Sequence, residues 1–521
     1  MRMHFAPATM LTLLICLFMP GRGIAQGATI VGDGSPASCT AAALAAAVAA
    51  GGEITFACGA APVTVVTSQL TIAGGQSVVI DGGDLVTLSG GNANRLFRVQ
   101  PGAMLTLRRL ILTDGNAGND YGGAIYVNTG GALNVEQGAI RNSRTNGWAG
   151  GAIIDFQGTV TLTDSVVENN QSSYGALNST GTLTLIRTTV RNNVATSGGG
   201  AMSVGGATLI QASSVEGNSA PEGGAIYASG TVTILDSSIK ANTANRGGAI
   251  YATTAGDIQV VGSHFLQNTV DGTISAEAFG GGIVSFGKLT VRGSLFEANQ
   301  ALGYGGAILA GPGSDEAFTQ VYTSTFVANQ AGERGGAIDN RRGRLDVVNS
   351  TFGGNSAGAG GAIQNFLGPA NLYYVTLAGN NGGVGGVLDQ SAYAGYVDDS
   401  RQRFNVYHTA LAQVANCAIS GTAGPLPHFV SGGYNLAEDD SCAFFMNQPG
   451  DLNGVPAQLE GLADNGGGAW THLPSAGSSL IDAAPCLPDF NADQRGVSRP
   501  QGARCDIGAV EVQTDATPPP T

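Results

Sequence analysis

Lysine is almost absent from this sequence, and charge of either sign is scarce. Only two lysines occur among 521 residues, charged residues make up 12% of the chain, and the formal net charge is −14. No basic stripe is present. Because a nucleic-acid duplex is bound mainly through such basic surfaces, we expect no nucleic-acid partner.

Long apolar runs are missing beyond the N-terminus. No segment after residue 25 reaches the roughly 18 apolar residues of a membrane-spanning helix, so we expect no transmembrane segment in the mature chain. Residues 1–25 have the pattern of a secretory signal peptide, with Arg2 at the start, an apolar stretch at Leu11–Phe18 and small residues at Gly23–Ala25. The sequence therefore predicts an exported protein, either secreted or located at the cell surface.

Cysteine is missing between Cys58 and Cys417. Of the seven cysteines, Cys16 lies in the expected signal peptide, and the other six fall as three local pairs: Cys39 and Cys58, Cys417 and Cys442, Cys486 and Cys505. An even number of cysteines in an exported chain predicts disulfides. Several connectivities are possible, and we favour the local one. The C-x-x-C spacing of zinc sites is lacking, which disfavours metal ligation.

Glycine, by contrast, is abundant, with 82 residues, and much of it recurs in one motif. Gly-Gly-Ala-Ile, or a degenerate copy of it, recurs about every 25 residues, beginning at Gly122, Gly150, Tyr174, Gly199, Gly223, Gly247, Gly280, Gly305, Gly335, Gly360 and Gly385. A period of this size indicates stacked units of supersecondary structure.

Each repeat has a second landmark, an asparagine that precedes the next glycine pair. These asparagines are Asn170, Asn193, Asn218, Asn242, Asn268, Asn299, Asn329, Asn355 and Asn380. Shortly before each of them stands an apolar residue, which is phenylalanine at 265, 296, 326 and 352. Short alternating runs such as Thr231–Leu235 lie between the landmarks, and such alternation is typical of β-strands.

These features predict an all-β fold, a right-handed parallel β-helix with three short strands per coil of about 25 residues. Equivalent residues of successive coils then lie about 4.8 Å apart. The apolar positions are expected to form an internal column. The asparagines are expected to form a structural ladder of hydrogen bonds inside a turn.

The chain divides into five expected segments. These are the signal peptide (1–25), an N-terminal cap (26–62), the β-helix repeats (63–390), a C-terminal disulfide-containing module (391–511) and a disordered tail (512–521). Within the cap, Thr40–Ala50 suits a short helix that covers the open end of the first coil. Longer turns are inserted around Asp271–Phe279 and Gly311–Phe318, and inserted turns often carry the binding surface of a solenoid.

The most charged coil supplies the candidate catalytic residues Asp339, Asp389, Arg341 and Arg342. Asp339 and Asp389 occupy equivalent positions two coils apart, which would separate their backbones by about 9–10 Å. This separation is near the upper limit for the two carboxylates of an inverting glycosidase. The alternative, which we favour from the sequence, is that these are solvated charges on an exposed turn.

A second candidate site lies near the C-terminus, where Asp489, Asn491 and Asp493 have the alternating spacing that opens a calcium-binding loop. Gln494 and Pro500 depart from the pattern of such loops. We therefore expect a turn packed beside a disulfide and no cofactor, with Ca²⁺ as the alternative.

The remaining histidines and aromatic residues give weaker signals. His408, His428 and His472 follow no catalytic or metal-binding spacing, and we interpret them as structural or surface residues. Four aromatic residues lie in or beside the glycine turns: Tyr121, Trp148, Tyr227 and Tyr251. If they line one face of the solenoid, they would stack on sugar rings. The alternative is that they only cover the turns.

Motifs near both ends support a family resemblance. Cys39-Thr40 is followed by Gly51–Phe56, and the C-terminal part contains Asp464–Gly467, Asp493–Val497 and Cys505–Glu511. With its repeats, the chain resembles the exported β-helix proteins related to the polymorphic outer-membrane proteins, and its termini are similar to the choice-of-anchor Q group. The resemblance implies the pectin-lyase-like superfold. It implies no activity, because that superfold includes enzymes and non-enzymes.

We therefore expect a secreted or cell-surface structural and interaction protein of adhesin type without intrinsic catalysis. Its partners would be surface glycans or other cell-surface proteins. The alternative is a carbohydrate-active β-helix enzyme, a polysaccharide lyase or glycoside hydrolase acting on a pectin-like polymer. Acidic and arginine side chains that converge in a groove would favour this alternative.

Overall fold

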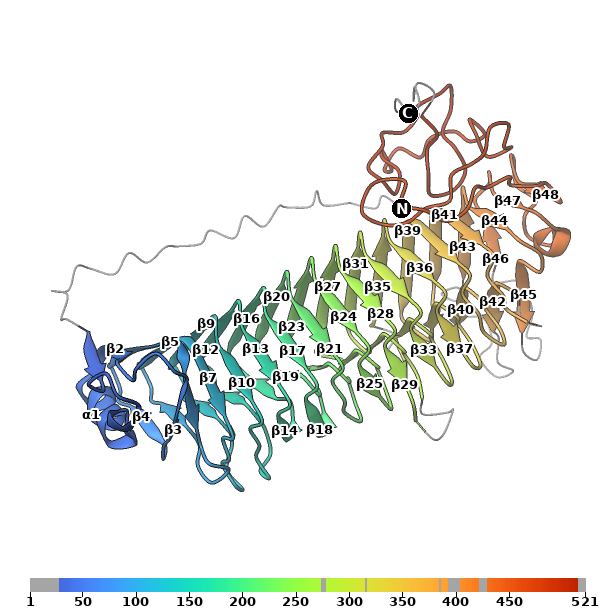
Figure 1. Cartoon of the computed structure of the whole chain (residues 1–521). Coiled ribbons are helices and arrows are strands. Elements are labelled where there is room, and N and C mark those ends of the chain that lie inside the picture. Colours follow the sequence, from blue (N-terminus) through green and yellow to red (C-terminus); the bar gives the residue numbers. More distant parts are fainter. Residues whose placement is uncertain are drawn as a thin grey trace.

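The computed structural model describes residues 28–272, 278–313, 316–383, 386–391, 403–420 and 429–513. The expected signal peptide, Gly385, His428 and the tail from residue 514 onward lie outside the described residues, as do the tips of both inserted turns. The chain forms an elongated parallel β-solenoid of about 15 turns (Figure 1). The predicted parallel β-helix is thereby confirmed.

One long sheet, here called sheet B, receives one short strand from each coil. Its 14 strands run in chain order, and every neighbouring pair is parallel. They are β4 (Leu70–Ile72), β6 (Phe97–Val99), β8 (Ile125–Val127), β11 (Ile153–Asp155), β15 (Leu177–Ser179), β19 (Met202–Val204), β22 (Ile226–Ala228), β26 (Ile250–Ala252), β30 (Ile283–Ser285), β34 (Ile308–Ala310), β38 (Ile338–Asn340), β40 (Ile363–Phe366), β42 (Leu388–Ser391) and β45 (Cys417–Ser420).

A second sheet, here called sheet A, has 28 strands, because most coils contribute two strands separated by a bend. The strands are β1 (Thr29–Val31), β2 (Gly52–Phe56), β3 (Val63–Val66), β5 (Ser77–Ser89), β7 (Met104–Thr113), β9 (Ala132–Glu136), β10 (Ala139–Arg141), β12 (Thr159–Thr163), β13 (Val166–Glu168), β16 (Thr182–Ile186), β17 (Thr189–Arg191), β20 (Ala207–Gln211), β21 (Ser214–Glu216), β23 (Thr231–Leu235), β24 (Ser238–Lys240), β27 (Asp257–Val261), β28 (His264–Leu266), β31 (Lys288–Arg292), β32 (Leu295–Glu297), β35 (Phe318–Tyr322), β36 (Thr325–Val327), β39 (Arg344–Gly353), β41 (Ala370–Ala378), β43 (Phe404–Tyr407), β44 (Ala410–Ala412), β46 (Phe429–Ser431), β47 (Leu436–Ala437) and β48 (Leu452–Asn453).

Some coils add a short strand on a third side of the solenoid. These strands are β14 (Gln171–Tyr174), β18 (Val194–Gly198), β25 (Thr243–Ala244), β29 (Thr269–Val270), β33 (Gln300–Ala301) and β37 (Gln330–Ala331). A repeat coil thus has the three predicted strands, one in sheet B and two in sheet A, and in places a fourth.

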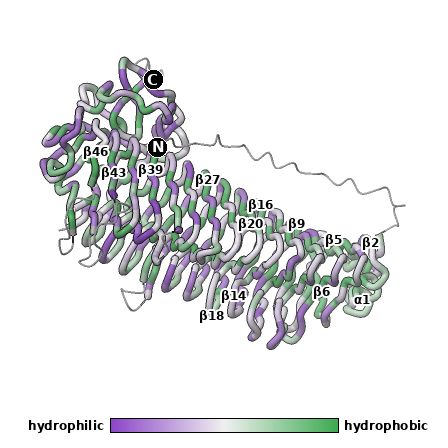
Figure 2. Tube along the Cα trace, turned by 180° about the vertical axis from the view of Figure 1, so that it is seen from behind, coloured by the Kyte–Doolittle hydropathy of each residue, from purple (hydrophilic) through white to green (hydrophobic). Residues whose placement is uncertain are grey.

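The core follows from the alternation of side chains along each strand. In β23, Val232 and Ile234 are buried whereas Thr231 is exposed, and Val232 lies in register with Ile258 of the next coil. Figure 2 shows hydrophobic and hydrophilic residues interspersed along each coil. The predicted phenylalanine column is confirmed: Phe265, Phe296, Phe326 and Phe352 are fully buried and stack with centroid distances of 4.7, 4.9 and 4.9 Å.

The glycine pair bends the chain where two coils come close together. Gly247 has a φ of 63°, in the left-handed region that glycine tolerates best. A Cβ atom on Gly248 would collide with the carbonyl oxygen of Gly281 in the next coil. The repeat therefore requires glycine at both positions, for two different reasons.

The repeated asparagines are buried and bonded from coil to coil. Nδ2 of Asn242 donates to the carbonyl oxygens of Val215 (3.0 Å) and Lys240 (3.1 Å) and to Oδ1 of Asn268 (3.0 Å). Oδ1 of Asn242 in turn accepts from N and Nδ2 of Asn218, both at 3.0 Å. The same pattern connects the asparagines from Asn170 to Asn380, so the amides form one continuous ladder.

The N-terminal end of the solenoid carries one α-helix, α1 (Ala41–Ala50), and a short 3-10 helix, η1 (Pro36–Ser38). The side chain of Thr40 caps α1 by accepting a hydrogen bond from Ala43 N. Leu44 and Val48 are buried in the same core cluster as the first coils. The helix expected at this end is present, and it packs on β1, β2 and β4 (Figure 1).

The sheets of the solenoid continue beyond residue 390. Strands β43 to β48 pair in register with the preceding coils, and a 3-10 helix, η3 (Asp440–Cys442), follows β47. Near this end Phe404, Phe429 and Phe445 stack at 5.0 and 4.8 Å. The three disulfides join the cysteines locally, as predicted, with Cα separations of 5.7, 5.1 and 5.1 Å: Cys39–Cys58, Cys417–Cys442 and Cys486–Cys505.

Residues 454–513, here called the C-terminal segment, fold back along the outer face of sheet A (Figure 1). Side chains of two coils, from β39 and β41, hold the segment there. The contacts are Asn349 Nδ2 to Ala492 O (2.8 Å), Thr351 Oγ1 to Gln494 Oε1 (2.6 Å), Leu487 N to Tyr374 Oη (3.0 Å) and Ala509 N to Thr376 Oγ1 (2.9 Å). Among the described residues, no helix has the length and apolar character needed to cross a membrane.

Candidate functional site

The middle residue of each sheet B strand points away from the core. In β22, for example, Ile226 and Ala228 are fully buried, whereas Tyr227 between them is half-buried. Strand register aligns these middle residues into one outer row: Arg98, Tyr126, Ile154, Asn178, Ser203, Tyr227, Tyr251, Val284, Leu309, Asp339, Gln364 and Asp389. The row is aromatic in the middle of the solenoid and becomes acidic toward its C-terminal part.

Aromatic rings follow this outer face over several coils. Tyr227 and Tyr251 are stacked with a centroid distance of 5.6 Å, and Phe286 lies 5.5 Å beyond Tyr251. All three are half-buried, so part of each ring contacts solvent. Of the other aromatic residues singled out from the sequence, Tyr121 packs on Phe156 at the N-terminal part of the sheet. Trp148 stands apart on a turn and is 68% exposed.

A pocket of about 250 Å³ continues this aromatic surface. Two of its lining residues, Pro312 and Gly313, come from the second inserted turn, and Arg341 and Arg342 come from the most charged coil. The rest of the lining is apolar or aromatic: Phe279, Tyr304, Leu309 and Phe366. Sequence reasoning predicted both inserted turns, the first of which ends at Phe279, and the arginines, but it missed Tyr304, Leu309 and Phe366.

An ion pair lies beside the pocket, because Arg341 lines the pocket and its partner Asp339 is buried next to it. Nε of Arg341 donates to Oδ2 of Asp339 at 2.9 Å, and the guanidinium lies 4.0 Å from the centroid of the Tyr304 ring. Asp339 is 0% exposed. Within the described part of the chain, Oδ1 of Asp339 and Nη2 of Arg341 are buried without a hydrogen-bond partner. The ion pair beside the pocket thus keeps one unused acceptor, on Asp339, and one unused donor, on Arg341.

Burial changes the titration of these groups. Burial raises the pKa of Asp339 to about 6, although the charge of Arg341 opposes the shift. The pKa of Tyr304 is also raised, first by burial and then by its hydrogen bond with Glu333. Burial alone would lower the pKa of Arg341, but the charge of Asp339 holds it above its ordinary value. A buried carboxyl group that changes protonation state near neutral pH, next to a pocket, is typical of functional sites.

The second acidic candidate, Asp389, lies on the same row. Strand register pairs Asp339 with Gln364, and Gln364 with Asp389, so the two carboxylates are two coils apart as predicted. Asp389 is also 0% exposed, and its charge is among the causes that raise the pKa of Asp339. Our interpretation of these residues as solvated charges on an exposed turn was therefore wrong.

A second amide ladder lies just inside this row. Nδ2 of Asn340 donates to Oδ1 of Asn365 at 2.7 Å, and Nδ2 of Asn365 donates to Oε1 of Gln390 at 2.7 Å. Sequence reasoning missed this ladder. The signal was present, because each of these residues stands five positions after the start of its glycine motif at Gly335, Gly360 or Gly385.

The calcium-loop candidates do not converge on a common point. Asp489 and Asn491 are exposed, whereas Asp493 is buried. Oδ1 of Asp493 accepts from Arg495 N at 2.8 Å, and Oδ2 accepts from the Arg495 guanidinium (2.8 Å) and from Glu511 N (2.9 Å). The carboxylate oxygens of Asp493 therefore stabilise the turn in which it lies. Across the described ranges, no group of three His, Cys, Asp or Glu side chains could hold a metal ion.

The other C-terminal motif residues also hold the fold. Arg499 and Glu511 form a buried ion pair at 2.8 Å, and the Arg499 guanidinium lies 4.2 Å from the ring centroid of Tyr374 in sheet A. His408 is buried against Tyr374, and burial lowers its pKa to about 4. These residues dock the C-terminal segment on the solenoid.

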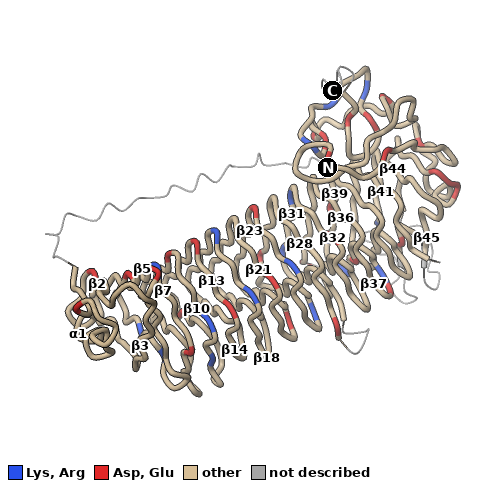
Figure 3. The backbone as a smooth tube through the Cα atoms, viewed as in Figure 1, with Lys and Arg blue, Asp and Glu red and all other residues tan. Residues whose placement is uncertain are grey.

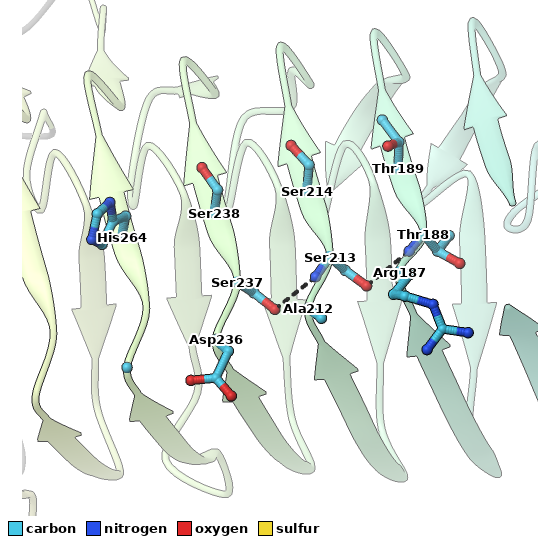
Figure 4. A pocket seen from close by; sticks show the side chains of 11 residues that line it. Arg187, Thr188, Thr189, Ala212, Ser213, Ser214, Asp236, Ser237, Ser238 and His264 are labelled. Atoms are coloured by element: carbon cyan, nitrogen blue, oxygen red, sulfur yellow. Dashed lines mark hydrogen bonds between the residues drawn. The ribbon is translucent and has the colours of Figure 1, made fainter. Parts of the chain in front are cut away.

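A different hollow follows the bend of sheet A. Figure 4 shows this groove of about 420 Å³, in which Thr189, Ser214, Ser238 and His264 lie at equivalent positions of four coils. The serine hydroxyls on its floor already bond the backbone of neighbouring coils; for example, Ser213 N donates to Ser237 Oγ at 3.1 Å. The groove contains neither an aromatic ring of Phe, Tyr or Trp nor a buried charge. The Arg341 pocket is therefore the better candidate site.

Comparison of the chain with models of protein families, with curated proteins and with solved structures found no match. The resemblance to the choice-of-anchor Q group accordingly stays a hypothesis that rests on the sequence motifs. The architecture itself is shown directly: this chain is a parallel β-solenoid of about 15 turns.

Proposed function

We propose that this protein is a secreted or cell-surface interaction protein that binds carbohydrate on the outer face of sheet B and does not cleave it. The observation that supports this function is the Arg341 pocket at the end of the aromatic row. Sugars are bound by aromatic rings that stack on their apolar faces and by a few fixed polar groups that bond their hydroxyls. Tyr227, Tyr251 and Tyr304 provide such rings, and Arg341 provides the polar group.

Export agrees with the cysteine chemistry of the chain. All six cysteines among the described residues are in disulfides, and these bonds persist mainly in oxidising compartments. An exported solenoid presents a long, rigid surface in which each coil supports its neighbours. This combination supports an adhesin-like role, with surface glycans as the partners that we favour.

The test is a binding screen of the full chain against cell-surface and plant-type glycans. For a ligand that binds, Tyr304→Ala should weaken the affinity by about tenfold, because one ring contact is lost. The matched control is Tyr126→Ala, which removes a tyrosine of sheet B far from the pocket and should leave the affinity unchanged. Equal affinity of Tyr304→Ala and the parent chain would reject the pocket as the binding site.

The second candidate function is glycoside hydrolysis, which the raised pKa of Asp339 favours. A carboxyl group with a pKa of about 6 is partly protonated near neutral pH, as a general acid requires, and Asp389 would supply a second carboxylate. Incubation with pectin-like polymers, with and without Ca²⁺, would reveal this activity as new reducing ends. Cleavage by the parent chain that Asp339→Asn abolishes would replace our proposal of binding alone.

A further inference from the structure

A third hollow lies where the C-terminal segment overhangs sheet A. It has a volume of about 770 Å³ and is here called the junction cleft. Its floor consists of Thr290 and Arg292 of β31 and Gln320 and Tyr322 of β35, and its wall is the loop 489–496. None of the residues that line the Arg341 pocket lines this cleft, so the two sites are separate.

The floor of the cleft carries a cation held in place by a ring. The guanidinium of Arg292 lies 4.6 Å from the ring centroid of Tyr322, and Nε2 of Gln320 donates to the Tyr322 hydroxyl at 2.6 Å. Arg292 is exposed, as is Lys288 at the other end of the same strand. Stacking on Tyr322 orients the planar guanidinium and leaves its N–H groups available to an anion.

These two cations differ from those of the earlier coils. On the same face, Arg187 pairs with Asp164 at 2.6 Å, Arg191 with Glu168 at 2.7 Å and Lys240 with Glu216 at 2.8 Å, and Figure 3 shows acidic and basic residues interspersed along the solenoid. Within the described chain, neither Lys288 nor Arg292 has a carboxylate within 4.0 Å. Lys288 and Arg292 therefore provide local positive charge on a protein whose net charge is −14.

The next strand along the sheet, β39, offers an unused acceptor to the cleft. Asn349 is 7% exposed, and its Nδ2 donates to Ala492 O at 2.8 Å. Its Oδ1 is buried and accepts no hydrogen bond from any described residue. A buried acceptor without a donor is unfavourable, so a hydroxyl group of a ligand in the cleft would stabilise this arrangement.

From these contacts we propose that the junction cleft binds an anionic oligosaccharide, with its carboxylate or sulfate on Arg292 and a ring hydroxyl on Asn349. The lining of the cleft fits a saccharide because it offers hydroxyl and amide groups, at Thr290, Gln320 and Thr323. An extended acidic peptide fits less well. Both floor strands are already paired on each side, β31 with β27 and β35, and β35 with β31 and β39, so no free strand edge can receive a peptide.

The experiment is a calorimetric titration of the full chain with four ligands: a carboxylated oligosaccharide, a sulfated one and a neutral one of equal length, and an acidic peptide. We expect the carboxylated or the sulfated sugar to bind, which identifies the anion, and the affinity to fall with added salt. Arg292→Gln should weaken this binding by at least about tenfold, since a charge-assisted hydrogen bond is lost. Arg187→Gln, an exposed arginine of the same face outside the cleft, should have no effect.

Several results would overturn the proposal. The neutral sugar binding as tightly as the charged ones would exclude recognition of an anion, and the acidic peptide binding as tightly would show that the ligand class is wrong. Binding that persists in Arg292→Gln but is lost in Tyr304→Ala would assign the ligand to the pocket on sheet B. Equal melting temperatures of Arg292→Gln and the parent chain would confirm that the variant is folded.

Discussion

The asparagine ladder can be tested by removing one amide from its middle. Asn242→Ala deletes five hydrogen bonds of the side chain, three donated by Nδ2 and two accepted by Oδ1. A sixth, donated by its backbone N to Asn268 Oδ1, is retained. Because residue 242 is fully buried, Asn218 N is left without the Oδ1 that accepts its hydrogen bond.

The expected loss of stability follows from these contacts. A buried donor without an acceptor costs about 1–3 kcal/mol. The remaining lost amide contacts and the space left by the side chain raise the total to roughly 2–4 kcal/mol. The matched control is Ser229→Ala in the same coil. Ser229 is exposed and makes one long hydrogen bond of 3.4 Å, so its loss should change stability by less than about 0.5 kcal/mol.

The assay is chemical denaturation of both variants followed by circular dichroism, with melting temperatures as a second measurement. A lower midpoint for Asn242→Ala than for Ser229→Ala is the expected result. If the two variants unfold at the same denaturant concentration and temperature, the ladder contributes nothing to stability. The reasoning from buried amides would then be refuted.

Two further predictions concern the disulfides and Asp339. Peptide mapping without reduction should recover Cys39–Cys58, Cys417–Cys442 and Cys486–Cys505, and free thiols or a Cys58–Cys417 link would contradict the structure. Because the pKa of Asp339 is raised to about 6 in the folded state, the stabilisation from its protonation is complete below pH 3.8 and is lost as pH rises through 6. Asp339→Asn does not titrate, so between pH 4 and pH 7 its stability relative to the parent chain should rise by roughly 2–3 kcal/mol, and a pH-independent difference would contradict the raised pKa.

The solenoid could be predicted from the sequence because its determinants are local and repeated. The glycine motif, the asparagine and the phenylalanine recur at one period, and a parallel stack places each of them on its equivalent in the next coil. Phe296, for example, needs only Phe265 and Phe326 as neighbours. One coil therefore contains most of the information about its own surroundings.

The burial of Asp339 could not be predicted in the same way. Its partner Arg341 lies against Tyr304 from the previous coil and Phe366 from the next, and neither ring belongs to the repeat pattern. From sequence alone, a charged residue in a turn is expected to be exposed. The contacts around this ion pair come from residues outside the repeat pattern, so its burial gave no periodic signal.

The position of the C-terminal segment was also beyond sequence reasoning. The hydrogen bond between Asn349 and Ala492 joins residues 143 positions apart, with no periodic signal to relate them. The C-terminal motif could be recognised from its residues. The contacts of Asp493, Arg495 and Glu511 within the segment, and those of Arg499 and Gln494 with sheet A, appear only in the fold.

The lateral attachment of the C-terminal segment has a consequence for how the solenoid opens. In a stack where each coil touches only its neighbours, coils can detach one after another from a free end. Here one segment contacts Asn349, Tyr374, Thr376 and, through Gly508 N, the carbonyl oxygen of His408. Coils that would otherwise unzip in sequence must therefore release the segment together. The C-terminal third should open as a single cooperative unit, while the earlier coils remain free to exchange their amide protons coil by coil.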